Sequence, residues 1–214
     1  MALSMSFNND HYKILPGVLT KDVAELAYRY LLNKRKIARF LFDQHYISPY
    51  CTEWGSWADK QIPETWSHYA DPLMETILEG LKPLMEEQSG LKLFETYAYV
   101  RIYKKGDILK RHKDRFSCEI STTLNLGGEP WSIYLEPTGK ENQKGVKVDL
   151  KAGDMLMYRG CELEHWREPF TGDNCAQVFL HYNDASSKDA VNNMFDKRPF
   201  LGLPSYFQSY KVIK

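Results

Sequence analysis

The chain has 214 residues, of which 43% are hydrophobic and 26% charged, values that exclude an intrinsically disordered protein and fit one domain of ordinary size. Its 28 Lys and Arg residues balance 28 Asp and Glu residues, which argues against nucleic-acid binding through overall positive charge. The sequence has no run of about 18 apolar residues, and residues 1–11 lack the apolar centre of a secretory signal. We therefore expect a cytoplasmic protein with no membrane partner.

Two helices are predicted within residues 1–90. The first begins at Thr20, a suitable N-cap, and the basic run 34–36 is expected to be solvated near its end. Its apolar residues recur at spacings of three and four: Val23, Leu26, Ala27, Tyr30 and Leu31. The second helix begins at Asp71 and ends at Gly90, with a kink expected at Pro83.

An aromatic segment without clean periodicity lies between these helices and carries Trp54, Trp57 and Trp66. Such segments often flank a binding surface, although aromatic rings also pack loops against a core. We expect part of the segment Tyr50–Tyr69 to lie near the mouth of a pocket and to be more mobile than the strands.

After Gly90 the hydrophobic period changes to two, which indicates strands separated by turns that contain glycine or proline. The eight candidates are Tyr97–Tyr103, Leu109–His112, Glu119–Asn125, Trp131–Leu135, Val146–Leu150, Met155–Arg159, Leu163–Arg167 and Ala176–Tyr182. Short strands at this spacing predict a β-sandwich or jelly roll, and the preceding helices would pack on one sheet to give an α+β fold. We expect a single domain over 1–214, with helical and aromatic support in 1–90, the core in 91–184 and a tail in 185–214.

The four cysteines, Cys51, Cys118, Cys161 and Cys175, form no Cys-x-x-Cys pair. That spacing disfavours a zinc ribbon, a redox dithiol and a disulfide-stabilised scaffold. We therefore expect reduced thiols, some of them in the core.

Three side chains in the strand region have the chemistry of a metal site. In an extended segment residues two apart point to the same side, so His112 and Asp114 offer an imidazole and a carboxylate together. His165 lies on a later strand that a jelly roll can bring alongside. Two histidines and one carboxylate on one face suit a divalent metal such as Fe(II) and leave coordination positions open for a cosubstrate and oxygen.

The stretch from Tyr97 to Asp184 resembles the Fe(II)- and 2-oxoglutarate-dependent dioxygenases, and most of all their prolyl 4-hydroxylase-like branch. The resemblance is carried by Tyr103-Lys-Lys-Gly106, His112-x-Asp114, Ser121-Thr-Thr-Leu-Asn125, Gly153-Asp154, His165 and Gln177–Tyr182. It implies a double-stranded β-helix fold of the jelly-roll type. It also implies Fe(II) held by His112, Asp114 and His165, with 2-oxoglutarate and O2 as cosubstrates and ascorbate as an optional reductant.

The resemblance assigns further roles to single residues. Tyr103 matches the tyrosine that hydrogen-bonds the cosubstrate in this branch, and Thr123 matches a position beside the far carboxylate of 2-oxoglutarate. Asp114 stands where related halogenases carry Ala or Gly, which favours a hydroxylase.

One departure from the family pattern concerns the base that anchors 2-oxoglutarate. The family usually places Arg or Lys nine or ten residues after the second histidine, where this chain has Asn174 and Cys175. Arg167 follows His165 by two residues and therefore points to the same side of a strand, so it is the predicted anchor. Neutral hydrogen bonds are expected from Thr123 and Gln177, and the rival anchors are Arg101 and Arg159.

The function implied by the resemblance is hydroxylation of a C–H bond, with a prolyl or other amino-acid residue of a peptide or free amino acid as the first candidate substrate. One alternative is a cupin-like jelly roll that binds a metal or ligand without turnover. Another is oxidative demethylation of nucleic acid, but segment 174–182 lacks the further arginines that such enzymes usually carry on the last strand. The sequence determines neither the substrate nor the oligomeric state.

The sequence leaves two interpretations open for each of two further features, the basic segment Lys104–Arg115 and His181. The basic residues within Lys104–Arg115 either attract an acidic protein segment or a nucleic acid, or form a solvated strand edge. His181 either lines the pocket or is a hydrogen-bonded core residue.

Overall fold

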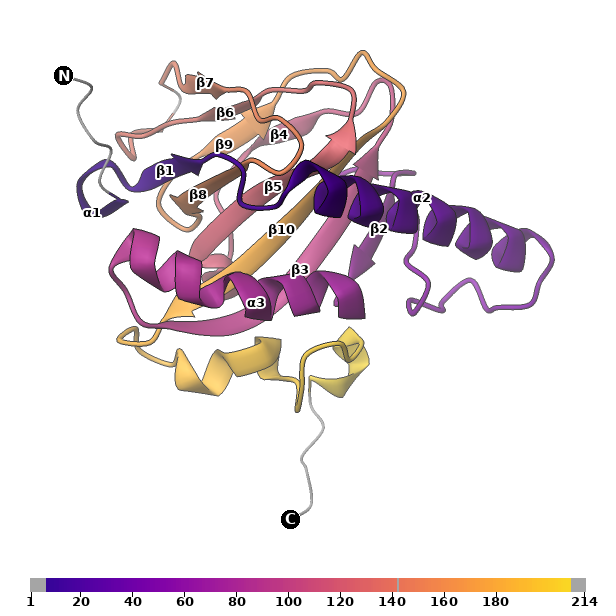
Figure 1. Ribbon diagram of the computed structural model, residues 1–214. Coiled ribbons are helices and arrows are strands. Elements are labelled where there is room, and N and C mark those ends of the chain that lie inside the picture. Colours follow the sequence, from indigo (N-terminus) through magenta and orange to yellow (C-terminus); the bar gives the residue numbers. More distant parts are fainter. Residues whose placement is uncertain (1–6, 142, 209–214) are drawn as a thin grey trace.

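The computed structural model describes residues 7–141 and 143–208, which form two antiparallel sheets with helices on one side (Figure 1). The six-stranded sheet has the order β1-β8-β5-β10-β3-β2, and the four-stranded sheet has the order β4-β9-β6-β7. The strands are β1 (Tyr12–Leu15), β2 (Trp66–Tyr69), β3 (Leu93–Tyr103), β4 (Leu109–His112), β5 (Ile120–Gly128), β6 (Ile133–Leu135), β7 (Val146–Val148), β8 (Met155–Arg159), β9 (His165–Arg167) and β10 (Cys175–Asp184). This arrangement confirms the predicted double-stranded β-helix.

All eight predicted strands are present. Leu109–His112 and Met155–Arg159 have the predicted ends and the other six have shifted ends. The structure adds β1 and β2 within the region expected to be helical and irregular. Each is only four residues long, and β1 pairs with β8 while β2 pairs with β3. Strands this short carry little periodic signal of their own. Pairing with longer neighbours, and not local propensity, therefore decides that these residues are extended.

The helices are α1 (Phe7–Asp10), α2 (Lys21–Asp43) and α3 (Pro72–Ser89), followed by short 3-10 turns η1 (Phe116–Cys118), η2 (Val191–Lys197) and η3 (Ser205–Phe207). Helix α2 packs against β5, and α3 packs against β3 and β10, so both cover the six-stranded sheet as expected (Figure 1). No helix within the described ranges 7–141 and 143–208 is long and apolar enough to cross a membrane.

The predicted ends of the helices are largely confirmed. The Thr20 hydroxyl accepts a hydrogen bond from the Val23 amide, and the Asp71 carboxylate accepts from two amides in the first turn of α3. Gly90 ends α3 in the left-handed conformation, with a φ of 73°. Helix α3 continues through Pro83 as one element.

The expected faces of α2 are wrong in two respects. Val23 and Leu26, placed on the apolar stripe, are 45% and 68% exposed. Lys34, expected to be solvated near the helix end, is buried and its ammonium lies 2.6 Å from the Asp71 carboxylate. The helix runs to Asp43 because no glycine or proline interrupts it, and this continuation turns Lys34 onto the buried face with Ala27 and Leu31.

The period of two along the strands separates two layers of core. In β8, Met155 and Met157 pack with the helices, whereas Leu156 and Tyr158 face the space between the sheets. Along β3 the even-numbered Val100 belongs to the helix-facing core, while its odd-numbered neighbours point between the sheets. The functional side chains are therefore those on the inner faces of both sheets.

The C-terminal part of the described chain is anchored by one buried and one partly exposed ion pair. Arg198 pairs with Glu75 of α3 at 2.8 Å, and Asp196 pairs with Arg115 at 2.8 Å. The division of the chain into support, core and tail remains a prediction. All four cysteines are free thiols, as expected.

Candidate functional site

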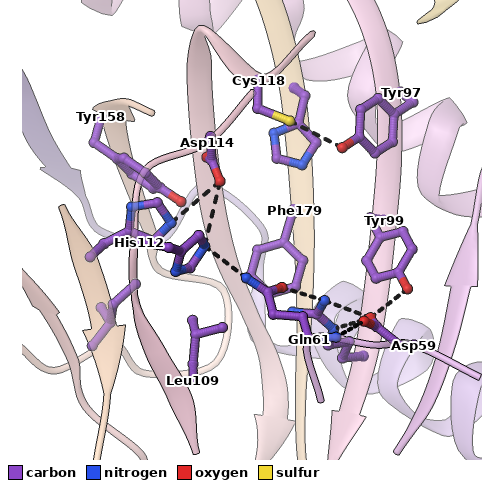
Figure 2. Close-up of a pocket in the computed structure, with 14 residues that line it drawn as sticks. Asp59, Gln61, Tyr97, Tyr99, Leu109, His112, Asp114, Cys118, Tyr158 and Phe179 are labelled. Atoms are coloured by element: carbon purple, nitrogen blue, oxygen red, sulfur yellow. Dashed lines mark hydrogen bonds and ion pairs between the residues drawn. The ribbon is translucent and has the colours of Figure 1, made fainter. Parts of the chain in front are cut away.

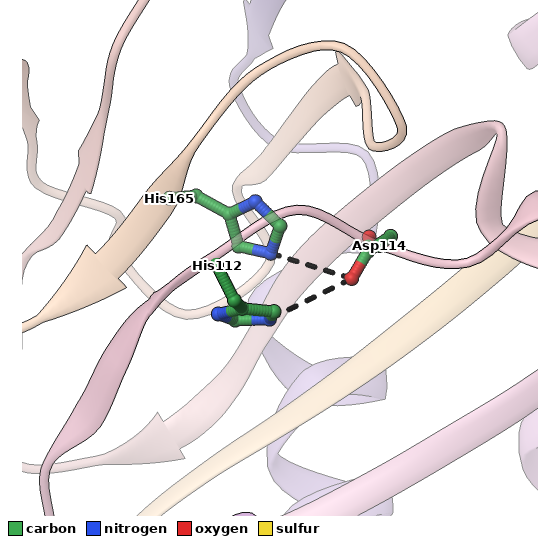
Figure 3. A group of neighbouring side chains, drawn as sticks. All are labelled: His112, Asp114 and His165. Carbon is green, nitrogen blue, oxygen red and sulfur yellow. Dashed lines mark ion pairs between the residues drawn. The ribbon is translucent and has the colours of Figure 1, made fainter. Parts of the chain in front are cut away.

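The three predicted metal ligands converge between the sheets (Figure 3). His112 ends β4 and His165 begins β9, and these two residues are paired across the antiparallel strands. One oxygen of Asp114, Oδ1, lies 3.6 Å from His112 Nε2 and 3.5 Å from His165 Nε2. The three ligand atoms therefore surround one point.

Hydrogen bonds prepare both imidazoles for metal coordination. His112 Nδ1 lies 2.8 Å from the Lys110 carbonyl oxygen, and His165 Nδ1 lies 3.1 Å from the Leu163 carbonyl oxygen. Because a carbonyl only accepts, each Nδ1 carries the proton and each Nε2 keeps its lone pair. Burial, together with the neighbouring His165, also lowers the pKa of His112, which favours the neutral ring that metals require.

Asp114 is held as a carboxylate with one oxygen free. Burial alone would raise its pKa, but His165 and a hydrogen bond from Ser121 lower the pKa well below the usual value. The Ser121 hydroxyl donates to Oδ2 at 2.8 Å, and the Asp114 amide donates to the Gly160 carbonyl at 2.8 Å. A Cβ at Gly160 would overlap this carboxylate and the backbone oxygen of Cys118, so glycine is required here.

The predicted ligands open onto a cavity of about 220 Å³ between the sheets (Figure 2). Its walls come from β3, β4, β6, β8, β9, β10 and the segment before β2. They are apolar at Leu109, Ile133 and Phe179 and polar at Arg101 and His181. The site therefore combines a small polar ligand cluster with walls that are partly apolar.

The expectation that part of Tyr50–Tyr69 lies near the pocket is confirmed, although Trp57 and Trp66 of this segment do not line it. Trp66 is buried in the helix-facing core, and Trp57 packs beside Phe42 of α2. The cavity is instead reached by Asp59 and Gln61 of this segment. Its greater mobility remains a prediction.

Asp59 forms a buried ion pair with Arg101 on the cavity wall. Arg101 Nε and Nη2 lie 2.9 and 2.6 Å from Asp59 Oδ2, which also accepts from the Tyr99 hydroxyl at 2.7 Å. Burial would raise the pKa of Asp59, yet Arg101 and Tyr99 outweigh it and lower the pKa. Sequence reasoning missed Asp59 because an aspartate in an irregular loop carries no periodic signal.

Gln61 links this ion pair to the predicted ligands (Figure 2). Its amide nitrogen lies 2.9 Å from His112 Nε2, and its amide oxygen accepts from Arg101 Nη2 at 2.6 Å. The Gln61 side chain therefore occupies the lone pair that His112 would offer to a metal.

Arg167 is buried, with 1% of its surface exposed, and is not the solvent-facing strand-end residue that was the alternative. Nη1 donates to the Trp131 carbonyl at 2.5 Å, and Nη2 donates to the Thr123 hydroxyl at 3.3 Å. Its Nε has no hydrogen-bond partner, and among the described residues no carboxylate forms an ion pair with it. A buried guanidinium is thus left with unused capacity for an anion.

The other residues predicted for 2-oxoglutarate lie around Arg167. The Thr123 hydroxyl donates to Gln177 at 3.1 Å, and the Tyr103 ring packs against Trp131, over which the guanidinium of Arg167 also lies. The positive charge of Arg167 also acts on the Cys175 thiol. Arg167 is therefore surrounded by the residues that were predicted to bind 2-oxoglutarate, and its hydrogen bonds go to Trp131 and Thr123.

The rival anchors have other partners. Arg101 is paired with Asp59, and Arg159 lies 3.6 Å from Glu162 and over the ring of Phe7. Both interpretations of His181 hold, because it is buried, hydrogen-bonded to Ser121 at 3.0 Å, and part of the cavity wall.

No protein-family model matches this sequence, and no curated protein matches it. Among solved structures, a Pseudomonas putida prolyl-4-hydroxylase aligns over 84% of this chain and 96% of its own, with a TM-score of 0.57 and 15% identity. HygX from Streptomyces hygroscopicus, with nickel and 2-oxoglutarate bound, aligns over 84% and 85%, with a TM-score of 0.59 and 13% identity. The chain has the fold of these proteins.

A third structure shows how varied the reactions on this fold are. The α-ketoglutarate-dependent epimerase SnoN from nogalamycin biosynthesis aligns over 84% of this chain and 78% of its own, with a TM-score of 0.58 and 18% identity. A hydroxylase and an epimerase thus share one architecture, so the reaction has to be argued from the site itself.

Proposed function

We propose that this protein is an Fe(II)- and 2-oxoglutarate-dependent oxygenase that hydroxylates a C–H bond of a prolyl or other amino-acid residue. The observation that carries the proposal is the convergence of His112 Nε2, His165 Nε2 and Asp114 Oδ1 on one point at the wall of a cavity. Iron and 2-oxoglutarate would supply the activation of O2. In the balanced reaction, C–H, 2-oxoglutarate and O2 give C–OH, succinate and CO2.

The donor set fits the metal. His112 and His165 would supply two neutral nitrogens, and Asp114 would supply one anionic oxygen from the third side. This set suits Fe(II) and leaves open the positions that a chelating cosubstrate needs. Binding of the metal would displace the Gln61 amide from His112 Nε2, since both use the same lone pair.

The surroundings of Arg167 fit the far carboxylate of 2-oxoglutarate. A buried, unpaired guanidinium is costly, and a carboxylate would both neutralise it and occupy the free Nε. Arg167 is two residues from His165 on the same strand, a displacement of about 6–7 Å that is comparable with the length of the cosubstrate. Thr123 and Gln177 would add neutral hydrogen bonds, and Tyr103 would line the part of the site that holds the far carboxylate.

The remaining cavity residues would position the substrate and exclude water. Phe179 and Ile133 provide apolar contact area, while the Asp59–Arg101 pair fixes a polar wall opposite the ligands. A dry, preorganised site strengthens every electrostatic interaction within it.

Anaerobic titration with Fe(II) and 2-oxoglutarate tests the proposal. The enzyme should develop a weak visible charge-transfer band, whereas a cupin-like binding module should develop none. The single changes His112→Ala, Asp114→Ala and His165→Ala should abolish both the band and succinate formation while the far-ultraviolet circular dichroism stays native. Asp173→Ala, a change at an exposed acid outside the cavity, is the matched control. Wild-type turnover in all three ligand variants would refute the assignment.

The substrate class needs a separate measurement. Substrate-stimulated succinate formation should be compared between proline-containing peptides, peptides with other residues at the same position, and free amino acids. Stimulation by peptides alone would support the peptidyl substrate, and stimulation by neither class would overturn it.

A further inference from the structure

A second cavity of about 540 Å³ adjoins the candidate active site and shares Gln61 and His112 with it. It is formed by two segments that are far apart in the sequence, residues 60–63 and 104–110. We call it the lysine groove. Because the two cavities meet at His112, anything that lies along the groove is led directly to the predicted metal ligands.

The groove carries an excess of positive charge. Four lysines line it, Lys60, Lys104, Lys105 and Lys110, against one acid, Asp107. Asp107 is buried and already used, since it pairs with Lys104 at 2.9 Å and accepts from the Thr65 hydroxyl and the Lys104 amide. The other three lysines are exposed and form no ion pair within residues 7–141 and 143–208.

The acidic residue next to Lys60 in the sequence is turned away from it. Asp59, which precedes Lys60, is directed to Arg101 on the cavity wall. Arg111, which follows Lys110 in the sequence, pairs with Glu164 at 2.8 Å. The fold thus gathers three unpaired cations from two segments at the entrance to one site. Because Lys60 comes from a separate loop, the positive charge extends beyond the edge of one strand.

We infer that the lysine groove binds acidic residues of a peptide substrate, on one side of the residue that enters the cavity. The inference rests on the proposed function, because it concerns the substrate of that same site. Three lysines would attract carboxylates and raise the rate of encounter, while the apolar Ile62, Pro63 and Ile108 would contact the rest of the peptide. A single-stranded nucleic acid is disfavoured because, among the residues that the structure describes, no Phe, Tyr or Trp ring lines the groove to stack with bases.

Binding can be measured without turnover. A fluorescein-labelled peptide with three glutamates beside one proline is titrated with the full chain, anaerobically in the presence of Fe(II) and 2-oxoglutarate, and followed by anisotropy. Its matched control has glutamine in place of each glutamate. The acidic peptide should bind about tenfold more tightly, since each partly exposed ion pair contributes only modestly, and the difference should shrink as salt is raised.

The triple variant Lys60→Gln, Lys105→Gln, Lys110→Gln should lose this preference. The control variant Lys21→Gln, Lys36→Gln, Lys188→Gln removes the same charge from exposed positions that line neither cavity, and should keep it. Equal binding of the two peptides, or a triple variant that still prefers the acidic one, would overturn the inference. So would a labelled oligonucleotide that outcompetes the acidic peptide for the wild-type groove.

The charge-transfer band separates this inference from the proposed function. Groove variants should retain the band, because they change neither metal ligands nor Arg167. A normal band without any preference for the acidic peptide would contradict the inference about the lysine groove and leave the proposed function standing. Absence of the band in the wild-type chain would instead contradict the proposed function, regardless of how the two peptides bind.

Discussion

Two buried arginines on facing sheets have opposite environments. Arg101 lies on β3 of the six-stranded sheet and is 7% exposed, and Arg167 lies at the end of β9 in the four-stranded sheet and is 1% exposed. Arg101 has a carboxylate partner in Asp59, with two nitrogens on one oxygen. Arg167 has a carbonyl and a hydroxyl as partners and no acid.

The pKa values reflect the same difference. Burial lowers the pKa of both guanidinium groups, but for Arg101 the neighbouring Tyr103 and Asp59 reverse the shift and raise it. For Arg167 burial dominates and the pKa falls. A buried arginine with an acid serves the structure, because it fixes the segment that carries Asp59 and Gln61. A buried arginine without an acid is suited to receive an anionic ligand.

The largest expected effect comes from removing each charge in turn. Arg101→Met leaves Asp59 buried and unpaired, so it should lower the free energy of unfolding by about 3–5 kcal/mol. Arg167→Met removes a charge that has no counter-ion, so the loss should be about 1 kcal/mol or less. Urea unfolding of the metal-free chains measures both. Equal losses in the two variants would contradict the comparison.

The second effect concerns the cosubstrate. Arg167→Ala should raise the apparent KM for 2-oxoglutarate about a hundredfold, the loss expected for one buried charge-assisted interaction, while iron affinity stays nearly unchanged. Arg167→Lys should recover part of that loss, because it restores the charge without the planar fork. Steady-state succinate formation gives the KM values, with Arg29→Ala as the control at an exposed ion pair. An unaltered KM in Arg167→Ala would refute this assignment and leave Arg101 and Arg159 as the candidate anchors.

A third test uses pH to measure how much the ionised Asp59, paired with Arg101, stabilises the protein. Because the folded pKa of Asp59 is lowered, its ionised form stabilises the protein fully above about pH 4, the unfolded pKa, and this contribution is lost as pH falls toward the folded pKa. Asp59→Asn should cost about 2 kcal/mol at pH 7, and the difference from wild type should shrink below about pH 4. Unfolding curves from pH 3 to 7 would reveal it. A constant difference across that range would argue against the ion pair.

The smallest expected effect concerns Gln61, which bridges Arg101 and the predicted metal ligand His112. Gln61→Ala frees His112 Nε2 from its hydrogen bond, so divalent metal should bind up to about fivefold more tightly, the worth of one ordinary hydrogen bond. Anaerobic Fe(II) titration of the two chains measures this. Weaker metal binding in the variant would mean that Gln61 supports the site and does not compete for it.

Much of the fold was predictable from local pattern. The period of two after Gly90 located eight strands, because alternation is what a sheet with two different faces requires. Thr20 and Asp71 identified two helix starts through the hydrogen bonds their side chains can accept. The spacing of His112 and Asp114, and of His165 and Arg167, likewise brought the paired side chains to one interior side.

The partners of those side chains were decided by tertiary structure alone. Periodicity states which face a residue occupies, but not which residue lies across the space from it. Asp59, Lys60 and Gln61 lie in a loop with no regular period. Nothing local indicates that Asp59 contacts Arg101 or that Gln61 contacts His112. The sequence also does not indicate that Lys60 lines the same groove as Lys105. From the sequence alone Lys34 is expected to be a surface cation. The structure places the Asp71 carboxylate beside it, and only such a neighbouring carboxylate makes its burial favourable.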